Sequence, residues 1–125
     1  MHSSPFDPTL LIQRQLDAYN ARDVDALLST YGLDARQFEY PEKLLATGHA
    51  EMRPRFLARF QEPNLHAFLI HRIVAGTTVI DHELITRTFP EGPGTIELIA
   101  IYEIRDGLIA EARFITSSKT LSARA

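Results

Sequence analysis

The sequence predicts an α+β fold in which a strongly curved β-sheet carries helices on its concave side. Three observations support this. Helical periodicity is confined to the first half of the chain, and long strands with turn signals fill the second half. The strand predicted over 96–104 is apolar at nearly every position, which favours cover on both of its faces. In a chain of 125 residues, helices can cover one face, and a second subunit is the simplest cover for the other.

Two helices are predicted before the first strand. Asp7 and Pro8 are typical of a helix start, with the aspartate as N-cap and the proline at the first helical position. Apolar residues then recur at helical spacing until about residue 21. Asp23 can cap a second, short helix that Gly32 is expected to end. These two helices should form a hairpin.

A short strand over 36–40 and a third helix come next, separated by a loop that includes a possible small strand over 41–47. Met52, Phe56 and Phe60 recur every fourth residue and indicate the helix. Pro54 conflicts with a helix interior, where proline costs ~3 kcal/mol. The helix is therefore expected either to begin only shortly before Met52 or to be kinked at the proline.

The remainder of the chain is predicted to form four long strands in two hairpins. The first hairpin turns at Gly76-Thr77 and the second at Arg105-Asp106-Gly107, a strong signal for a tight turn. A turn rich in glycine and proline joins the hairpins. The whole chain, 1–125, is expected to be one domain, with loose tails at both ends. The four strands are expected over 65–75, 78–89, 95–104 and 108–116. The tails are expected over 1–6 and 117–125.

Composition excludes several function classes. A net charge of −3 and an isoelectric point near 5.9 give no electrostatic basis for binding nucleic acid or anionic membranes. The chain has no cysteine, which excludes disulfides, thiolate catalysis and cysteine-ligated zinc or iron–sulfur clusters. The first residues lack the features of a signal peptide, and no apolar run approaches the ~20 residues needed to span a bilayer. A cytoplasmic location is expected, and no cofactor.

Three segments carry a resemblance to a known superfamily. They are AYNARDVDAL at 18–27, Tyr31 with Asp34-Ala35, and YEIRDGLI at 102–109. Together they resemble the nuclear transport factor 2-like superfamily, and within it small SnoaL-like bacterial proteins that are often labelled steroid isomerase-like. The resemblance implies a cone of curved, mixed β-sheet with three helices on the concave face, the cystatin-like roll. It also implies a pocket inside the cone. The same scaffold serves ketosteroid isomerases, SnoaL-like polyketide cyclases and non-catalytic binding modules.

The resemblance to ketosteroid isomerase can be checked at three positions. Tyr40 stands where those enzymes carry their general-base aspartate, and Gln15 where they carry the tyrosine that binds the oxyanion. Their protonated aspartate falls near Ala100. Ketosteroid isomerase chemistry is therefore not expected, unless a β-bulge re-aims Glu39 into the base position.

Two histidines form the sharpest catalytic hypothesis. A two-residue turn at Gly76-Thr77 pairs His71 with His82, and the resemblance places their face inside the cone. Imidazole can move protons near neutral pH, and Tyr19 or Tyr102 could orient the substrate oxygen. The alternative is that both histidines simply hydrogen-bond to backbone. A three-residue turn would place them on different faces.

A metal site is not expected at this histidine pair. Such sites usually need a third ligand, and the nearby acidic side chains are predicted on the opposite face. Arg53, Arg55 and Arg59 are expected on a solvated helix face, although they could steer an anionic ligand toward the mouth. The residues expected to line the pocket are Gln15, Tyr40, Met52, Phe56, Phe60, Leu98, Ala100, Tyr102 and Phe114.

Two function classes remain open at this point. The first is a cofactor-independent acid–base enzyme, an isomerase, cyclase or dehydratase, acting on a small apolar carbonyl compound. The second is a non-catalytic pocket for an apolar metabolite, or a dimeric interaction module. In both cases a homodimer is expected through the outer face of the sheet, where Ile99 and Ile101 need cover.

Overall fold

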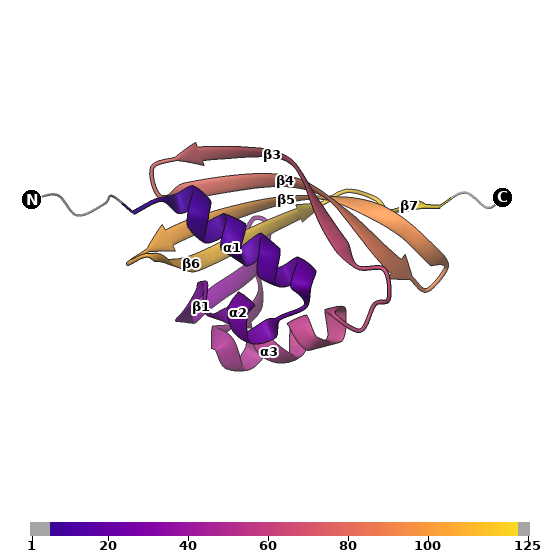
Figure 1. Ribbon diagram of the computed structural model, residues 1–125, viewed down its shortest axis with the longest axis horizontal. Coiled ribbons are helices and arrows are strands. Elements are labelled where there is room, and N and C mark those ends of the chain that lie inside the picture. The colour runs from indigo at the N-terminus through magenta and orange to yellow at the C-terminus, as the bar shows by residue number, and fades with distance from the viewer. Residues whose placement is uncertain (1–5, 123–125) are drawn as a thin grey trace, which may run out of the picture.

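The computed structural model describes residues 6–122, which form three helices and seven strands (Figure 1). The outermost residues of the two predicted tails, 1–5 and 123–125, lie outside the described range. The elements in chain order are α1 (Pro8–Ala21), α2 (Val24–Leu28), β1 (Tyr31–Glu39), β2 (Lys43–Thr47), α3 (Gly48–Arg59), β3 (His66–Ala75), β4 (Thr78–Phe89), β5 (Gly92–Arg105), β6 (Leu108–Thr116) and β7 (Thr120–Leu121).

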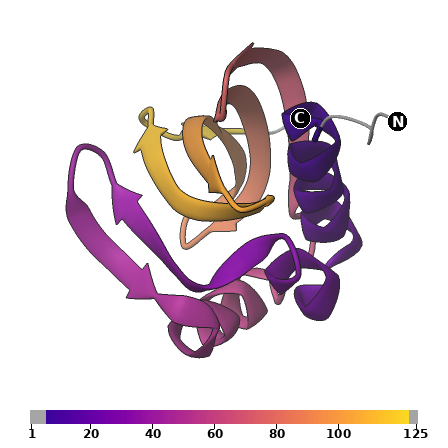
Figure 2. The ribbon, with the colours of Figure 1, turned by 90° about the vertical axis from the view of Figure 1, so that its left-hand side faces the viewer.

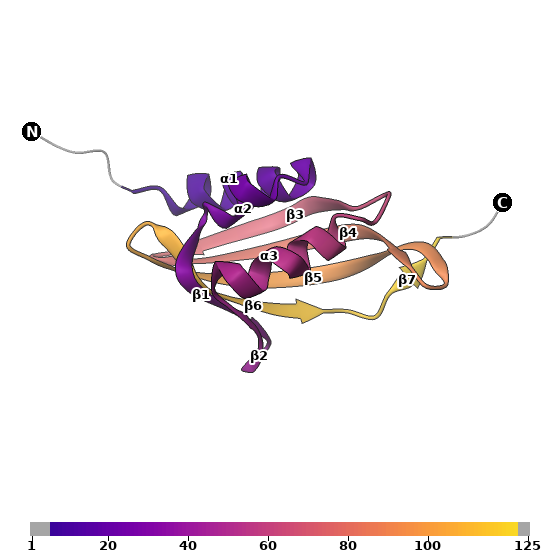
Figure 3. The ribbon, with the colours of Figure 1, turned by 90° about the horizontal axis from the view of Figure 1, so that it is seen from below.

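The strands form one mixed, open sheet in the order β2-β1-β6-β5-β4-β3, with β7 paired to β5. Neighbours in this order are antiparallel, except that β1 and β6 are parallel. The sheet is strongly curved, and the helices lie on its concave side (Figures 2 and 3). The predicted α+β cone is confirmed. None of the helices in the described range is long and apolar enough to cross a membrane.

The hydrophobic core fills the space between the helices and the concave face of the sheet. Its members come from every helix and from the central strands, and many are completely buried. Ile12, Leu27, Met52, Val79 and Ile109 each expose none of their surface. Burial of such side chains supplies about 1.5–3 kcal/mol each, which makes this layer the main source of stability.

The AYNARD segment closes the end of α1 and ties it to distant parts of the chain. Arg22 adopts a left-handed conformation, with φ of 58°, and its backbone N–H caps the helix. Its guanidinium donates to the carbonyl oxygens of Phe60 and Pro63 beyond α3. The Asn20 side chain donates to the Ala67 carbonyl and accepts from the Ala67 N–H. It thereby provides hydrogen-bond partners for both backbone groups of this residue in edge strand β3. This segment, which carries part of the family resemblance, therefore has a structural role: it links the end of α1 to β3 and to the residues that follow α3.

Two element boundaries differ from the prediction. The second helix ends at Leu28 instead of near Gly32, because the Thr30 hydroxyl donates to the Leu27 carbonyl and closes the turn. Strand β1 therefore begins at Tyr31, well before the predicted residue 36. The third helix begins at Gly48, so Pro54 lies in its interior.

The hairpin turns follow the prediction, and the C-terminal segment does not. Asp106 and Gly107 both have positive φ, 55° and 77°, as a tight hairpin turn requires. Residues after Ser117 were expected to be loose, yet Thr120 and Leu121 pair with β5. This pairing depends on Gly94, because a Cβ there would lie only 2.4 Å from the Thr120 carbonyl oxygen.

Candidate functional site

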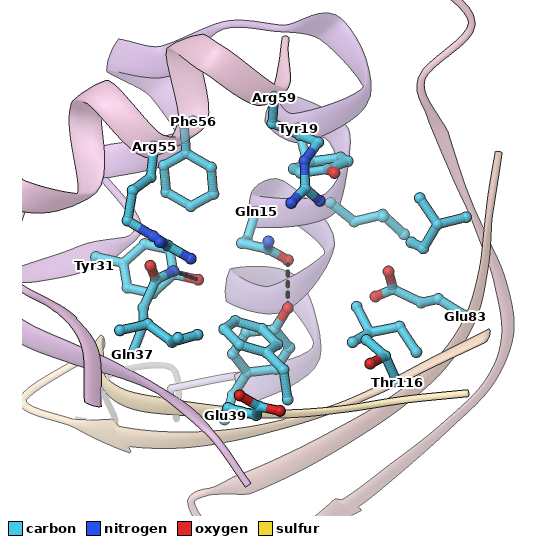
Figure 4. Close-up of a pocket in the computed structure, with 16 residues that line it drawn as sticks. Gln15, Tyr19, Tyr31, Gln37, Glu39, Arg55, Phe56, Arg59, Glu83 and Thr116 are labelled. Carbon is cyan, nitrogen blue, oxygen red and sulfur yellow. Dashed lines mark hydrogen bonds between the residues drawn. The ribbon is translucent and has the colours of Figure 1, made fainter. Parts of the chain in front are cut away.

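A cavity of about 270 Å³ lies between the helices and the concave face of the sheet (Figure 4). Its walls come from α1, α3 and five strands, so it is the interior of the cone. Its lining mixes apolar side chains with phenols, amides and a few charged groups. The lining residues are Gln15, Leu16, Tyr19, Tyr31, Gln37, Glu39, Leu45, Arg55, Phe56, Arg59, Glu83, Ile85, Leu98, Tyr102, Phe114 and Thr116.

Half of the residues predicted for the pocket line it. Six of them line the cavity: Gln15, Tyr19, Phe56, Leu98, Tyr102 and Phe114. Three others, Met52, Phe60 and Ala100, are buried in the surrounding core without lining the cavity. Tyr40 is 52% exposed and does not line it, since it stands just past the end of β1.

The predicted placement of the two histidines in the pocket is wrong. His71 and His82 are cross-strand partners, as the two-residue turn requires. However, they lie on the outer face of the sheet. His71 is exposed, and His82 shares a 2.7 Å hydrogen bond between its Nε2 and the Oε1 of Glu97. Neither histidine lines the cavity.

The register of β4 against β5 explains the reversal. Val79 lies opposite Tyr102, Asp81 opposite Ala100, and Glu83 opposite Leu98. Partners in an antiparallel sheet share a face, so the acidic residues of β4 point into the cone with these partners. The intervening His82 lies opposite Ile99 on the outer face.

Asp81 is completely buried, and its charge is compensated by an arginine from β3. The Nε and Nη2 atoms of Arg72 donate to the two carboxylate oxygens of Asp81 at 2.6 and 2.8 Å. The Nη1 atom donates to Oε1 of Gln13 on α1 at 2.9 Å. This bidentate pair raises the pKa of Arg72, chiefly through its hydrogen bonds to Asp81. Asp81 is therefore paired at both oxygens with an arginine that is itself tied to α1.

Glu83 is the second inward-facing acid of β4, and its carboxyl group points into the cavity (Figure 4). Only 3% of its surface is exposed. The pKa of Glu83 is raised to about 8, chiefly by burial and secondly by the negative charge of neighbouring Asp81. The positive charge of Arg72 has a smaller, opposite effect. At neutral pH this carboxyl group mostly retains its proton.

Phenols and amides supply the other polar groups of the cavity. The Tyr102 hydroxyl donates to Oε1 of Gln15 at 3.3 Å, and Nε2 of Gln37 donates to the Tyr31 hydroxyl at 3.4 Å. Burial raises the pKa of both phenols, so they remain neutral donors. Burial also raises the pKa of Tyr19, and the nearby Arg59 partly offsets this rise.

Asp81 and Glu83 were predicted on the outer face because the resemblance placed His82, which alternates with them along the strand, inside the cone. The alternation of Val79, Asp81, Glu83 and Ile85 in one phase was the available signal, since it begins and ends with apolar residues. The competing phase contains His82 and is equally apolar, so periodicity could not choose between the two faces. No group of three or more metal-binding side chains with the required proximity occurs within residues 6–122.

Three solved structures illustrate what the chain resembles. An uncharacterised cystatin-fold protein from Novosphingobium aromaticivorans is 25% identical, with a TM-score of 0.81 over 89% of this chain and 99% of that one. A proposed polyketide cyclase from Sinorhizobium meliloti is 22% identical, with a TM-score of 0.71 over 88% and 100%. A hypothetical protein with a ketosteroid isomerase-like fold from Catenulispora acidiphila, solved with trimethylamine, is 13% identical, with a TM-score of 0.73 over 84% and 83%.

None of the curated proteins matches this sequence significantly. The family model described as the SnoaL-like domain matches residues 12–112, from the first turns of α1 to the middle of β6. That range contains nearly all of the pocket's walls, including β4 with its two acids. The chain therefore belongs to the SnoaL-like family.

Proposed function

We propose that this protein is an acid–base enzyme that moves a proton on a small apolar carbonyl compound, as an isomerase, cyclase or dehydratase would. The observation that carries the proposal is Glu83, a buried carboxyl group that faces a cavity lined mainly by rings and aliphatic chains. A carboxyl group with a pKa of about 8 can exchange its proton near neutral pH, as a general acid–base catalyst must.

The proton path requires only groups that line the cavity. In its ionised form Glu83 takes a proton from the carbon next to a substrate carbonyl, and the electron pair moves onto the carbonyl oxygen. The Tyr31 hydroxyl, which accepts from Gln37 and keeps its own proton to donate, stabilises that enolate oxygen. The proton on Glu83 then returns to a different carbon of the enolate, or protonates a leaving hydroxyl group.

The placement of the acids relates this pocket to the expectation drawn from ketosteroid isomerases. The position that carries a protonated aspartate in those enzymes is Ala100 here, and it lies directly opposite Asp81 on β4. The buried carboxyl group of this pocket, Glu83, thus comes from the strand next to β5 instead of from β5 itself. The similarity to a proposed polyketide cyclase supports a carbonyl compound as the substrate class.

Deuterium exchange tests this proposal without knowledge of the natural substrate. The protein is incubated with 2-tetralone in D2O, and loss of the α-proton signals is followed by NMR. Exchange should be accelerated by the wild-type protein and abolished by Glu83→Gln, which keeps the shape of the side chain. The control variant His82→Gln changes only the outer face and should exchange like wild type.

The pH dependence adds a second criterion. Because the ionised form begins the reaction, the exchange rate should rise with pH and level off above about 8. Equal exchange in wild type and Glu83→Gln would overturn the proposal. The pocket would then be assigned to the alternative function, a non-catalytic site for a small hydrophobic molecule.

A further inference from the structure

Two arginines on α3 border the cavity, and the acid–base chemistry proposed above uses neither. Arg55 and Arg59 are four residues apart, so they project from the same face of the helix, and both line the cavity (Figure 4). The third arginine of the predicted cluster, Arg53, points elsewhere, and its Nη2 lies 2.9 Å from Oδ1 of Asp25. From the sequence the three arginines were expected to form one cluster, whereas in the structure only Arg55 and Arg59 line the cavity.

The positive charge of these two arginines is only weakly compensated by protein groups. Within residues 6–122, no carboxylate oxygen lies within 4.0 Å of the Arg55 guanidinium. The Nε atom of Arg59 lies 3.5 Å from Oε2 of Glu62. Glu62 already accepts two hydrogen bonds from Arg87, at 2.6 and 3.1 Å, and one from the Thr88 N–H. Glu62 is therefore shared between two arginines and compensates the charge of Arg59 only in part.

The acidic residues of the cavity lie on other walls. Glu39 comes from β1, across the cavity from α3 in Figure 4, and its carboxylate lies 3.5 Å from Nζ of Lys43. Glu83 comes from β4. The side of the cavity formed by α3 therefore carries positive charge, from Arg55 and Arg59, and is called the positive wall below. Phe56 lies between these two arginines in the sequence.

Aromatic rings surround this positive wall and define the rest of the ligand. Phe56 stacks on Phe60 with ring centroids 6.1 Å apart, and it lies 6.2 Å from the Tyr31 ring. Tyr19 packs edge-on against Phe60 at 5.6 Å. Such a wall favours a flat, apolar ring system. The cavity, at about 270 Å³, is slightly smaller than the usual range of ligand sites, roughly 300–1,000 Å³, so a ligand of one or two rings fits it best.

We propose that the pocket binds a small cyclic carboxylate, with its carboxylate group held by Arg55 and Arg59 and its ring against the aromatic wall. Guanidinium groups bind carboxylates through paired, charge-assisted hydrogen bonds, which fix orientation as well as affinity. Anchored in this way, the ligand directs its other end across the cavity toward Glu83. The identity of the reacting end rests on the proposed function, whereas the carboxylate anchor rests on the arginines alone.

Binding of a matched pair of probes tests the anchor. Calorimetry compares 2-naphthoate with 2-naphthamide, which has the same rings and no charge. Wild type should bind the carboxylate at least about tenfold more tightly, and added salt should reduce this preference. The double variant Arg55→Gln/Arg59→Gln should bind both probes equally, at the affinity of the amide. Arg53→Gln, on the same helix, should keep the wild-type preference.

Two results would overturn the inference: equal affinity of wild type for the two probes, or a preference that survives in the double variant. The experiment also separates this inference from the proposed function. Glu83→Gln should still prefer the carboxylate, because the anchor lies on another wall. If wild type shows that preference but accelerates no proton exchange, the anchor stands and the proposed catalysis fails. If exchange occurs without the preference, the reverse holds.

Discussion

Asp81 and Glu83 lie two residues apart on β4, and both point into the concave side of the sheet. A single arginine, Arg72, pairs with one of them. Arg72 donates to both carboxylate oxygens of Asp81, whereas Glu83 lines the cavity. The arrangement separates two chemically similar acids into two roles: Asp81 is paired with an arginine, whereas burial, and after it the charge of Asp81, raises the pKa of Glu83. The first two predictions follow from this pair.

Wild type should lose stability as pH rises from about 4.5 to about 8, and Glu83→Gln should not show this loss. The pKa of Glu83 is about 8 in the folded protein, against an ordinary value of 4.5. The folded state therefore binds more protons than the unfolded state across that window, and its stability falls by up to ~1.4 kcal/mol per pH unit. Urea unfolding at pH 5 and pH 9 measures this. A variant that tracks wild type at both pH values would contradict the placement of Glu83.

Asp81→Asn should lower the pKa of Glu83. The substitution removes the negative charge that helps Glu83 hold its proton, while Arg72 remains and favours the ionised form. In wild type and variant, the Glu83 side-chain carboxyl carbon can be titrated by ¹³C NMR, and the midpoint should move down from about 8. An unchanged or higher midpoint would show that Asp81 does not set the proton affinity.

The Asp81→Asn variant needs a check on folding, because it leaves a buried arginine without its anionic partner, a change that can cost about 3–5 kcal/mol. Circular dichroism establishes whether it remains folded. If it does not, Gln13→Ala serves as a milder variant. It removes the hydrogen bond to Nη1 of Arg72 and the one that Gln13 donates to Asp17, keeps the Arg72–Asp81 pair, and should leave the Glu83 midpoint in place.

The fold could be predicted from the sequence largely because its signals are local. Asp7 with Pro8 marks a helix start, and Asp106 with Gly107 occupies positive φ values that few other residues tolerate. These choices depend on neighbouring atoms alone. The inward-facing residues of β5 and β6, such as Tyr102 and Phe114, were predicted from the match of this hairpin to ketosteroid isomerases, and both line the cavity.

The catalytic candidates could not be assigned from the sequence, because the face on which a residue lies depends on its neighbours in the sheet. Both faces of β4 carry apolar side chains, so alternation alone does not identify the buried face. A β-bulge near Ile70 adds a register shift: Phe68 instead of Leu69 lies opposite Leu84. Buried charge is also unexpected without knowledge of Arg72, which comes from a different strand to neutralise Asp81.

Gly94→Ala should detach β7 from the sheet. A methyl group at this position would lie 2.4 Å from the Thr120 carbonyl oxygen and 3.0 Å from the Leu121 Cα, and both are backbone atoms that cannot rotate away. Amide hydrogen exchange should show loss of protection at β7. Gly32→Ala is a matched control, because the added methyl group would meet its nearest atom at an ordinary 3.6 Å. Protection of β7 equal to wild type in Gly94→Ala would refute the pairing.

We also propose that two copies of the protein dimerise by packing the outer faces of their sheets together, and that Ile101→Lys prevents this dimerisation. Ile101 lies opposite Ile80, and Ile99 lies opposite His82, on the face that the helices leave open. Ile73 and Ile115 on the same face are 51% and 39% exposed. A lysine at Ile101 would place a charge at the centre of this apolar surface. Sedimentation velocity should therefore give dimers for wild type and monomers for the variant.

The control for this last prediction is Leu10→Lys. Leu10 is 63% exposed on α1, away from the outer face, so the same change of residue type adds a charge to an apolar side chain that the dimer leaves in water. This variant should sediment as wild type does. A dimer that persists in Ile101→Lys, or that is lost only in Leu10→Lys, would place the interface on the helical side. The apolar residues of the outer face would then remain exposed to water or be covered by a different molecule.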